Sequence, residues 1–148
     1  MADIARNKQA GYKYNFLETW EAGLQLQGSE VKSLRNGGVQ LKDSYATVRD
    51  GEVWLQNMHI APYAPASREN HEPERPRKLL LKKGEIERLI GRTSEKGLTL
   101  IPTRLYWKGS RAKVEIALAR AKNVQDKRRY LKEKDARREI DRAIQERA

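Results

Sequence analysis

Hydrophobic and polar residues alternate along much of the first 119 residues, a period of two that is typical of half-buried β-strands. The clearest case is Arg111–Ala119, in which alternate apolar side chains are expected to face inward: Ala112, Val114, Ile116 and Leu118. The pattern predicts short strands at residues 12–20, 24–27, 39–41, 44–48, 52–60, 78–81, 98–107 and 111–119, with a bend at 21–23.

Two turns join neighbouring strands of this set. Asp50-Gly51 lies between two apolar runs and predicts a tight hairpin. Lys108–Ser110 predicts a second hairpin between the last two strands. The run 52–60 is apolar on both faces, so we expect that strand to be central. Several short antiparallel strands with interspersed short helices predict a mainly β fold, a small closed antiparallel barrel.

Two short helices are expected between the strands. Ser29 has the residue type of a helix N-cap, and Glu30 would then begin a helix that Asn36-Gly37 ends. Lys32 and Arg35 would share one face of that helix. A second helix is expected at residues 85–90, ended by Gly91, with Ile86, Leu89 and Ile90 on one side.

Two segments lack a strand pattern. Residues 62–77 hold four of the five prolines and predict a long surface loop. Residues 120–148 have no glycine or proline, 11 Lys and Arg against 6 Asp and Glu, and few large apolar side chains. We therefore expect a barrel domain at 1–119 and a basic tail at 120–148, a nascent helix that is substantially disordered when free and orders against a polyanion.

The charge of the chain indicates its partners. The net charge is +11 at pH 7, and such a surplus favours a polyanion, most commonly nucleic acid. There is no cysteine, which excludes disulfides and thiolate metal sites and fits a reducing compartment. No run approaches the roughly 18 apolar residues of a membrane span, and we expect a cytoplasmic protein.

Several basic and aromatic residues are candidates for RNA contacts, and each also has an ordinary structural interpretation. Lys32 and Arg35 fit phosphate contacts or a solvated helix face. Residues 75–83 hold a denser set of cations that fits a stripe along a phosphate backbone: Arg75, Arg77, Lys78, Lys82 and Lys83. Rings at strand spacing fit base stacking or the core. Glu21 fits an RNA contact or an exposed turn carboxylate.

Catalysis finds little support in the sequence. His59 and His71 are the only histidines, and no set of His, Asp and Glu residues has a metal-ligand spacing. There is no glycine-rich phosphate loop. We expect a protein that is not an enzyme and needs no cofactor or metal.

Four co-linear segments resemble the small protein B family, whose bacterial members bind transfer-messenger RNA. They are AGLQLQGSEVKSLRNG at 22–37, LKDSYATVRDGEVWLQNMHIAPY at 41–63, NHEPERPRKLLLKKGEI at 70–86, and GLTLIPTRLYWKGSRAKVEIALA at 97–119. The resemblance covers roughly residues 6–128. It implies an oligonucleotide-binding-type (OB-like) barrel with a basic tail that folds as a helix in the empty mRNA channel.

The resemblance also implies a function in trans-translation, the rescue of stalled ribosomes. The barrel would bind the tRNA-like domain of transfer-messenger RNA, and the complex would enter the vacant ribosomal A site. The implied partners are transfer-messenger RNA and the small-subunit rRNA of the ribosome, with elongation factor Tu and alanyl-tRNA synthetase reached through the RNA. A structural ribosomal or cold-shock-like barrel protein is the alternative, and an RNA-processing enzyme is a third class.

Carried over by position, the resemblance implies two sets of site residues. The RNA-binding set is Tyr14, Glu21, Lys32, Arg35, Arg75, Arg77, Lys78, Leu80 and Lys82. The ribosome-binding set lies in the tail: Lys122, Asp126, Lys127, Arg128, Arg129, Lys132, Lys134, Arg137 and Arg138. The tail's entry departs from the family pattern, because Ala121, Asn123 and Gln125 replace a glycine, a lysine and an aromatic ring.

Overall fold

The computed structural model describes residues 2–64 and 70–147, so that residues 65–69 of the expected proline-rich loop lie outside it. In chain order the elements are β1 (Ala2–Arg6), α1 (Ala10–Lys13), β2 (Tyr14–Leu24), α2 (Gly28–Arg35), β3 (Val39–Gln40), β4 (Tyr45–Arg49), β5 (Glu52–Gln56), β6 (His59–Ile60), β7 (Arg77–Leu80), α3 (Lys83–Thr93), β8 (Leu98–Lys108), β9 (Arg111–Ala121) and α4 (Val124–Arg147).

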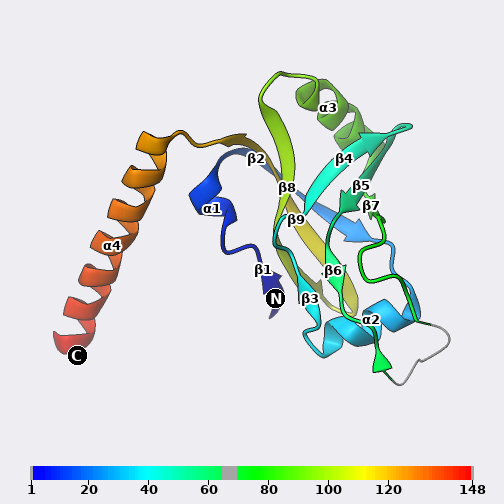
Figure 1. Cartoon of the computed structure of the whole chain (residues 1–148), viewed down its shortest axis with the longest axis horizontal. Helices are drawn as coiled ribbons and strands as arrows, with labels where there is room; N and C mark the ends of the chain where they lie inside the picture. Colours follow the sequence, from blue (N-terminus) through cyan, green and yellow to red (C-terminus); the bar gives the residue numbers. More distant parts are fainter. Residues whose placement is uncertain (1, 65–69, 148) are drawn as a thin grey trace.

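Seven of these strands form one antiparallel sheet, which winds around the centre of the molecule (Figure 1). Its order is β1-β8-β4-β5-β7-β2-β9, and β9 also pairs with β8 over its whole length. The pairings therefore form a circuit in which β4 and β8 are joined by one register pair, Ala46 with Leu100. The mainly β fold with short helices is confirmed. Closure of the sheet into a barrel rests on the single register pair between β4 and β8.

The core lies inside this circuit. The inward positions expected on β9 are all buried, and Val53 and Leu55 of β5 have no exposed surface. β5 occupies the middle of the sheet order, as its apolar pattern predicts. A second small cluster lies on the opposite face of β8 and β9, where α1 covers the sheet: Ala10, Ile101, Ala117 and Ala119.

Both expected hairpins are present. β4 and β5 are joined by Asp50 and Gly51, whose φ angles are 52° and 74°. Positive φ at both central residues is the conformation of a type I′ turn, which matches the twist of the flanking strands. β8 and β9 are joined at Gly109-Ser110, with Lys108 paired to Arg111.

The first part of the chain differs from the predicted pattern. β1 was not expected, and it adds to the edge of β8 through pairs from Ala2 to Arg6. The strand expected from residue 12 begins at Tyr14 instead, and residues 10–13 form α1. The bend predicted at residues 21–23 is wrong, because β2 continues through it to Leu24. A register shift between Phe16 and Glu18 takes up the irregularity instead.

The helix boundaries also differ from those predicted. The N-cap of α2 is Gln27, not Ser29, and a reciprocal pair of hydrogen bonds joins Gln27 to Glu30. The Ser29 hydroxyl instead lies 2.9 Å from Nδ1 of His71. α3 continues past Gly91 to Thr93, and Ile90 is exposed while Leu89 is buried.

Candidate nucleic-acid interface

Glu21 projects from the outer face of β2, between the inward Trp20 and Ala22. The Tyr106 hydroxyl donates a hydrogen bond to Oε2 of Glu21, and Nζ of Lys108 donates to Oε1 at 3.1 Å. These two donors, Tyr106 first, hold the pKa of Glu21 below its ordinary value of 4.5. An ionised carboxylate with 37% of its side chain exposed is therefore available to a ligand at neutral pH.

A groove of about 410 Å³ lies between the start of α2 and the β8–β9 hairpin, and it reaches β2 at Gly23, two residues from Glu21. Gly23 and Leu80 are register partners at its edge, and a Cβ on Gly23 would lie 3.2 Å from the Leu80 Cβ. Leu80 is 51% exposed. Two cations, Arg111 and Lys113, line the groove. The rest of its surface is mainly apolar and is supplied by Leu24, Leu26, Val31, Leu80, Trp107 and Ala112.

This combination suits an RNA backbone. Exposed apolar surface packs against sugars and bases, and the ammonium and guanidinium groups attract phosphates. The ionised Glu21 repels phosphate and accepts hydrogen bonds from hydroxyl and N–H groups. The structure thus brings Glu21 and Leu80 of the predicted set to one surface.

The α2 cations of the predicted set are exposed. Both Lys32 and Arg35 project outward, while Ser33 and Leu34 on the same helix are buried. Nζ of Lys32 lies 5.7 Å from the centroid of the Tyr63 ring. Because Val31 lines the groove, these two cations lie on a helix that borders it.

The assignment of Arg77 to the RNA surface is corrected by its position. Its side chain has no exposed surface, and its Nε lies 2.6 Å from Oε2 of Glu30. Its remaining donors bond the carbonyl groups of Met58 and Pro73. Arg77 faces inward because it alternates with Lys78 along β7 and shares the inner face with Leu79. It is a buried structural cation.

The expected stripe of cations at residues 75–83 is therefore not a single surface feature. Arg75 is half-buried and bonds Glu30 from the other side, with Nε 3.1 Å from Oε1. Lys78 faces outward and pairs with Glu52 at 2.7 Å. Lys82 is exposed and directly precedes α3. Of this set, Lys78, Lys82 and Lys83 remain on the outer surface.

Tyr14 lies in a different part of the molecule from Glu21. The two residues are at opposite ends of β2, seven positions and about 23 Å apart along the strand. Tyr14 pairs with Ala121 and packs against the small cluster beneath α1. It therefore lies where the tail begins, and it does not share a surface with Glu21 and Leu80.

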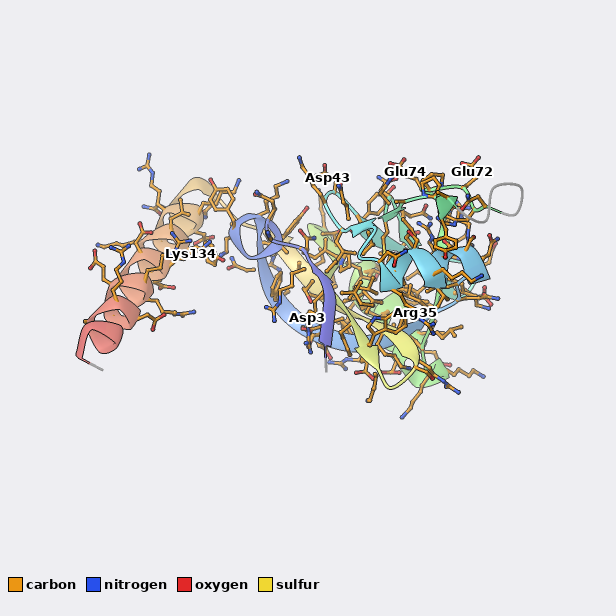
Figure 2. All side chains as sticks on the ribbon, turned by 90° about the horizontal axis from the view of Figure 1, so that it is seen from below. Asp3, Arg35, Asp43, Glu72, Glu74 and Lys134 are labelled. Carbon is orange, nitrogen blue, oxygen red and sulfur yellow. The ribbon has the colours of Figure 1, made fainter. Side chains whose placement is uncertain are left out.

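Most of the predicted tail cations are exposed. α4 extends away from the sheet, and its side chains project on several sides (Figures 1 and 2). Figure 2 shows Lys134 on this helix, apart from the body that carries Arg35. Three of the nine predicted tail residues are half-buried at the base of α4: Lys122, Asp126 and Lys127. The other six are exposed on α4: Arg128, Arg129, Lys132, Lys134, Arg137 and Arg138.

The base of α4 is attached to α1. Nζ of Lys122 donates to the carbonyl oxygen of Gly11 at 2.6 Å and lies 4.1 Å from the centroid of the Tyr130 ring. Nζ of Lys127 lies 5.4 Å from the centroid of the Tyr12 ring. Oδ1 of Asn123 accepts from the backbone N–H of Asp126 at 2.8 Å, so this departure from the family pattern supplies a helix N-cap.

Three residues around Glu21 were not predicted as site residues: Tyr106, Lys108 and Lys113. Lys113 lies on β9, where its register partner on β2 is Gly23 and its register partner on β8 is Tyr106. The hydrogen bond from Tyr106 spans 85 residues of sequence. The alternation of the β8–β9 hairpin would place Lys113 outward, and the strand register sets it opposite Gly23, close enough to Glu21 for its charge to help lower the pKa of that carboxyl.

Within residues 2–64 and 70–147, no group of three or more His, Cys, Asp and Glu residues is placed to hold a metal ion. His71 is buried and bonds Ser29 and the Ile60 carbonyl, so it serves the packing of the loop on α2. No helix within these ranges is long and apolar enough to cross a membrane.

The fold and this surface define a class, a small basic β protein with an apolar groove edged by cations and an extended cationic helix. The sequence model of the SmpB protein family matches residues 4–146, and the chain belongs to that family.

Individual relatives agree with this membership over almost the whole chain. The chain is 54% identical to the SsrA-binding protein of Carboxydothermus hydrogenoformans over 144 residues, which cover 97% of each protein. It is 57% identical to the SsrA-binding protein of Aquifex aeolicus over 140 residues, 94% of this chain and 89% of that one.

A solved structure is similar as well. It is described as "tmRNA-SmpB: a journey to the center of the bacterial ribosome", and one of its chains is 45% identical to this one. The two superpose with a TM-score of 0.68 over 86% of this chain and 93% of the other.

Proposed function

We propose that this protein is an RNA-binding adaptor of trans-translation, which binds the tRNA-like domain of transfer-messenger RNA and delivers it to the A site of stalled ribosomes. Its relatives are named SsrA-binding proteins, and the similar solved structure is of tmRNA with SmpB on the bacterial ribosome. The site of action is then the cytoplasm. The role is one of binding and positioning, without a chemical step on the RNA.

The observation that carries this proposal is the surface around Glu21. An exposed, ionised carboxylate lies next to exposed Leu80 and a groove edged by Arg111 and Lys113. Because A-form RNA presents 2′-hydroxyls and phosphates on a wide, shallow minor groove, recognition uses shape, hydroxyl contacts and charge. Lys32 and Arg35 on α2, with Lys78 and Lys82, extend this surface.

The chain divides into two parts with separate tasks in this proposal. Residues 1–119 bind the tRNA-like domain, and residues 120–148 occupy the vacant mRNA channel. The exposed cations of α4 support the second task, because a helix with basic side chains on several sides can contact the rRNA lining of a channel. Tyr14 and the half-buried Lys122, Asp126 and Lys127 lie at the junction of the two parts.

Two further partners follow from the RNA itself. A tRNA-like domain that carries alanine is a ligand of alanyl-tRNA synthetase and of elongation factor Tu. We propose that both act through the RNA.

The division of labour is tested by deleting residues 126–148. The shortened protein should bind the tRNA-like RNA as tightly as the parent, and peptide tagging in a reconstituted stalled-ribosome reaction should be lost. Alanylation of the RNA serves as a control that the barrel remains active. Loss of RNA binding together with tagging would contradict the division, and full tagging without the tail would contradict the task given to α4.

A further inference from the structure

We propose that Tyr106 is the positioning residue for Glu21, and that the carboxylate it orients accepts a pair of hydrogen bonds from RNA donor groups. This inference rests on the proposed contact between Glu21 and RNA. It concerns a residue that the sequence patterns did not mark as functional, and it names the chemistry that the site recognises.

Tyr106 is itself held in place by a chain of contacts across three strands. Its side chain is 2% exposed, and the guanidinium of Arg104 lies 4.4 Å from the centroid of its ring. Arg104 in turn pairs with Glu115 on β9 at 2.8 Å and with Asp3 on β1 at 3.2 Å. The phenol ring therefore has little freedom, and its hydroxyl is directed at Glu21.

The direction of the hydrogen bond is fixed by chemistry. A carboxylate only accepts, so the Tyr106 hydroxyl must donate. Burial, together with the bond to Glu21, raises the pKa of Tyr106 above its ordinary value, which keeps the proton on the phenol. The same bond helps to keep Glu21 ionised.

The register explains why such a support is needed. Glu21 lies directly opposite Glu115 in the β2–β9 ladder, and like charges in that arrangement repel each other. Arg104 neutralises Glu115, while Tyr106 and Lys108 draw the Glu21 carboxylate toward β8. Without Tyr106, the exposed Lys108 would be the remaining donor to Glu21, and its flexible side chain orients a carboxylate weakly.

The acceptor sites left on Glu21 determine what it can bind. A carboxylate has two lone-pair directions on each oxygen. Tyr106 occupies one on Oε2 and Lys108 occupies one on Oε1, so one acceptor site remains on each oxygen. Two parallel acceptors match two neighbouring donors, such as the N1–H and N2–H groups of an unpaired guanine or two ribose hydroxyls. Phosphate, which has no such donors, is left to the cations.

The test uses the full-length protein and a tRNA-like RNA, with affinity measured for Tyr106→Phe, Glu21→Gln and the double variant. Tyr106→Phe keeps the ring and removes the donor, and we expect about a ten-fold loss of affinity with the fold retained by circular dichroism. In the Glu21→Gln background the same change should cost less than two-fold. Tyr45→Phe, which alters an exposed tyrosine on β4, is the matched control and should leave affinity unchanged.

Two further readouts separate positioning from a structural role. Tyr106→Phe removes a donor that lowers the pKa of Glu21, so Glu21 should become protonated at a higher pH in the variant. As the solution is acidified, RNA binding by Tyr106→Phe should therefore decline at a higher pH than RNA binding by the parent. RNAs with inosine for guanine, or with single 2′-deoxy substitutions, distinguish a base edge from a ribose as the donor pair. The RNA substitution that removes a donor to Glu21 should weaken binding to the parent protein but not to Glu21→Gln.

The outcomes are distinct. A parent protein without preference for the tRNA-like RNA would overturn the proposed function and this inference together. A parent that binds, with Tyr106→Phe binding equally well, would overturn the inference alone. An equal loss from Tyr106→Phe in the parent and in Glu21→Gln would also overturn it, because the tyrosine would then act on stability. The absence of any RNA substitution coupled to Glu21 would overturn the paired-donor chemistry.

Discussion

The ring of Tyr130 on α4 lies against the backbone of Gly11 on α1. A Cβ built on Gly11 would lie 2.9 Å from the Tyr130 hydroxyl oxygen and 3.3 Å from Cζ, so any other residue at position 11 must displace the ring. The neighbouring Lys122 bonds the Gly11 carbonyl and lies over the same ring. We expect this contact to hold the base of the tail helix against the body.

Gly11→Ala should therefore loosen the tail while leaving the barrel folded. The added methyl group meets the far end of a flexible side chain, so that displacing Tyr130 is less costly than disrupting the sheet. The chain has no cysteine, and two introduced cysteines, at Lys134 and Asp43, allow spin labelling. The distance distribution between the labels should become broader than in the doubly labelled parent.

Gly84→Ala is the matched control for that experiment. A Cβ at Gly84, at the start of α3, meets no atom within 4 Å, so this substitution should not change the distance distribution. Equal distributions for the parent and Gly11→Ala would contradict the role of the Gly11–Tyr130 contact in holding the tail.

Substitution of Arg77 should lower the stability of the protein far more than substitution of Arg35. Arg77→Ala leaves the buried Glu30 with Arg75 as its remaining cation, and breaking such a buried pair costs about 3–5 kcal/mol of the free energy of unfolding. Arg35→Ala removes an exposed side chain and should change stability by about 0.5 kcal/mol or less. Urea unfolding followed by tryptophan fluorescence measures both. A loss of less than about 1 kcal/mol for Arg77→Ala would contradict its structural assignment.

The ionised form of Glu30 should make stability depend on pH. Burial would raise the pKa of this carboxyl, but the backbone N–H of Gln27 and the guanidinium groups of Arg75 and Arg77 outweigh burial and leave the pKa below 4.5. A group with a lowered folded-state pKa stabilises the protein above its unfolded-state pKa, and this stabilisation is lost as the pH falls through the folded-state pKa.

Unfolding of the parent and of Glu30→Gln at pH values from 7 to 3 measures this contribution. Above pH 5 the free energy of unfolding of the parent should exceed that of Glu30→Gln by a constant margin. This margin should shrink as the pH falls below 4.5. A margin that stays constant down to pH 3 would contradict a lowered pKa of Glu30 in the folded protein.

Lys32 and Arg35 should contribute to the salt dependence of RNA binding. If about five phosphates are neutralised, the log of the affinity falls with the log of the salt concentration with a slope of about −3 to −5. The double substitution Lys32→Ala with Arg35→Ala should reduce the magnitude of the slope by about 1.4–1.8, for two lost phosphate contacts. Arg88→Ala, whose guanidinium pairs with Glu18, is the control and should leave the slope unchanged. A slope equal to the parent's would remove both residues from the interface.

Local patterns predicted the parts of the fold whose structure is specified by adjacent residues. Asp50-Gly51 fixes its hairpin because a type I′ turn requires positive φ at both residues. The alternation along Arg111–Ala119 identified the buried face because one face of β9 packs in the core. β1 was missed because its strand conformation depends on pairing with β8, about 100 residues away.

The candidate site was harder to predict because it is assembled across strands. The cation cluster at residues 75–83 indicated a polyanion surface, but its charge count does not show which side chains face inward. Leu79 shares the face of Arg77, so the period of two should have placed Arg77 inside. The family resemblance made Glu21 a favoured site residue over its interpretation as an exposed turn carboxylate, and its partner Tyr106 could be found only from the three-dimensional structure.

The central claim is that a rigid barrel surface recognises the shape of a tRNA-like RNA. The most direct measurement is a competition experiment, in which the full-length protein binds a labelled tRNA-like domain against unlabelled scrambled transcripts of equal length at physiological salt. We expect the scrambled RNA to compete at least 100-fold less well, and Glu21→Gln to reduce this ratio. Equal competition by the two RNAs would contradict the account.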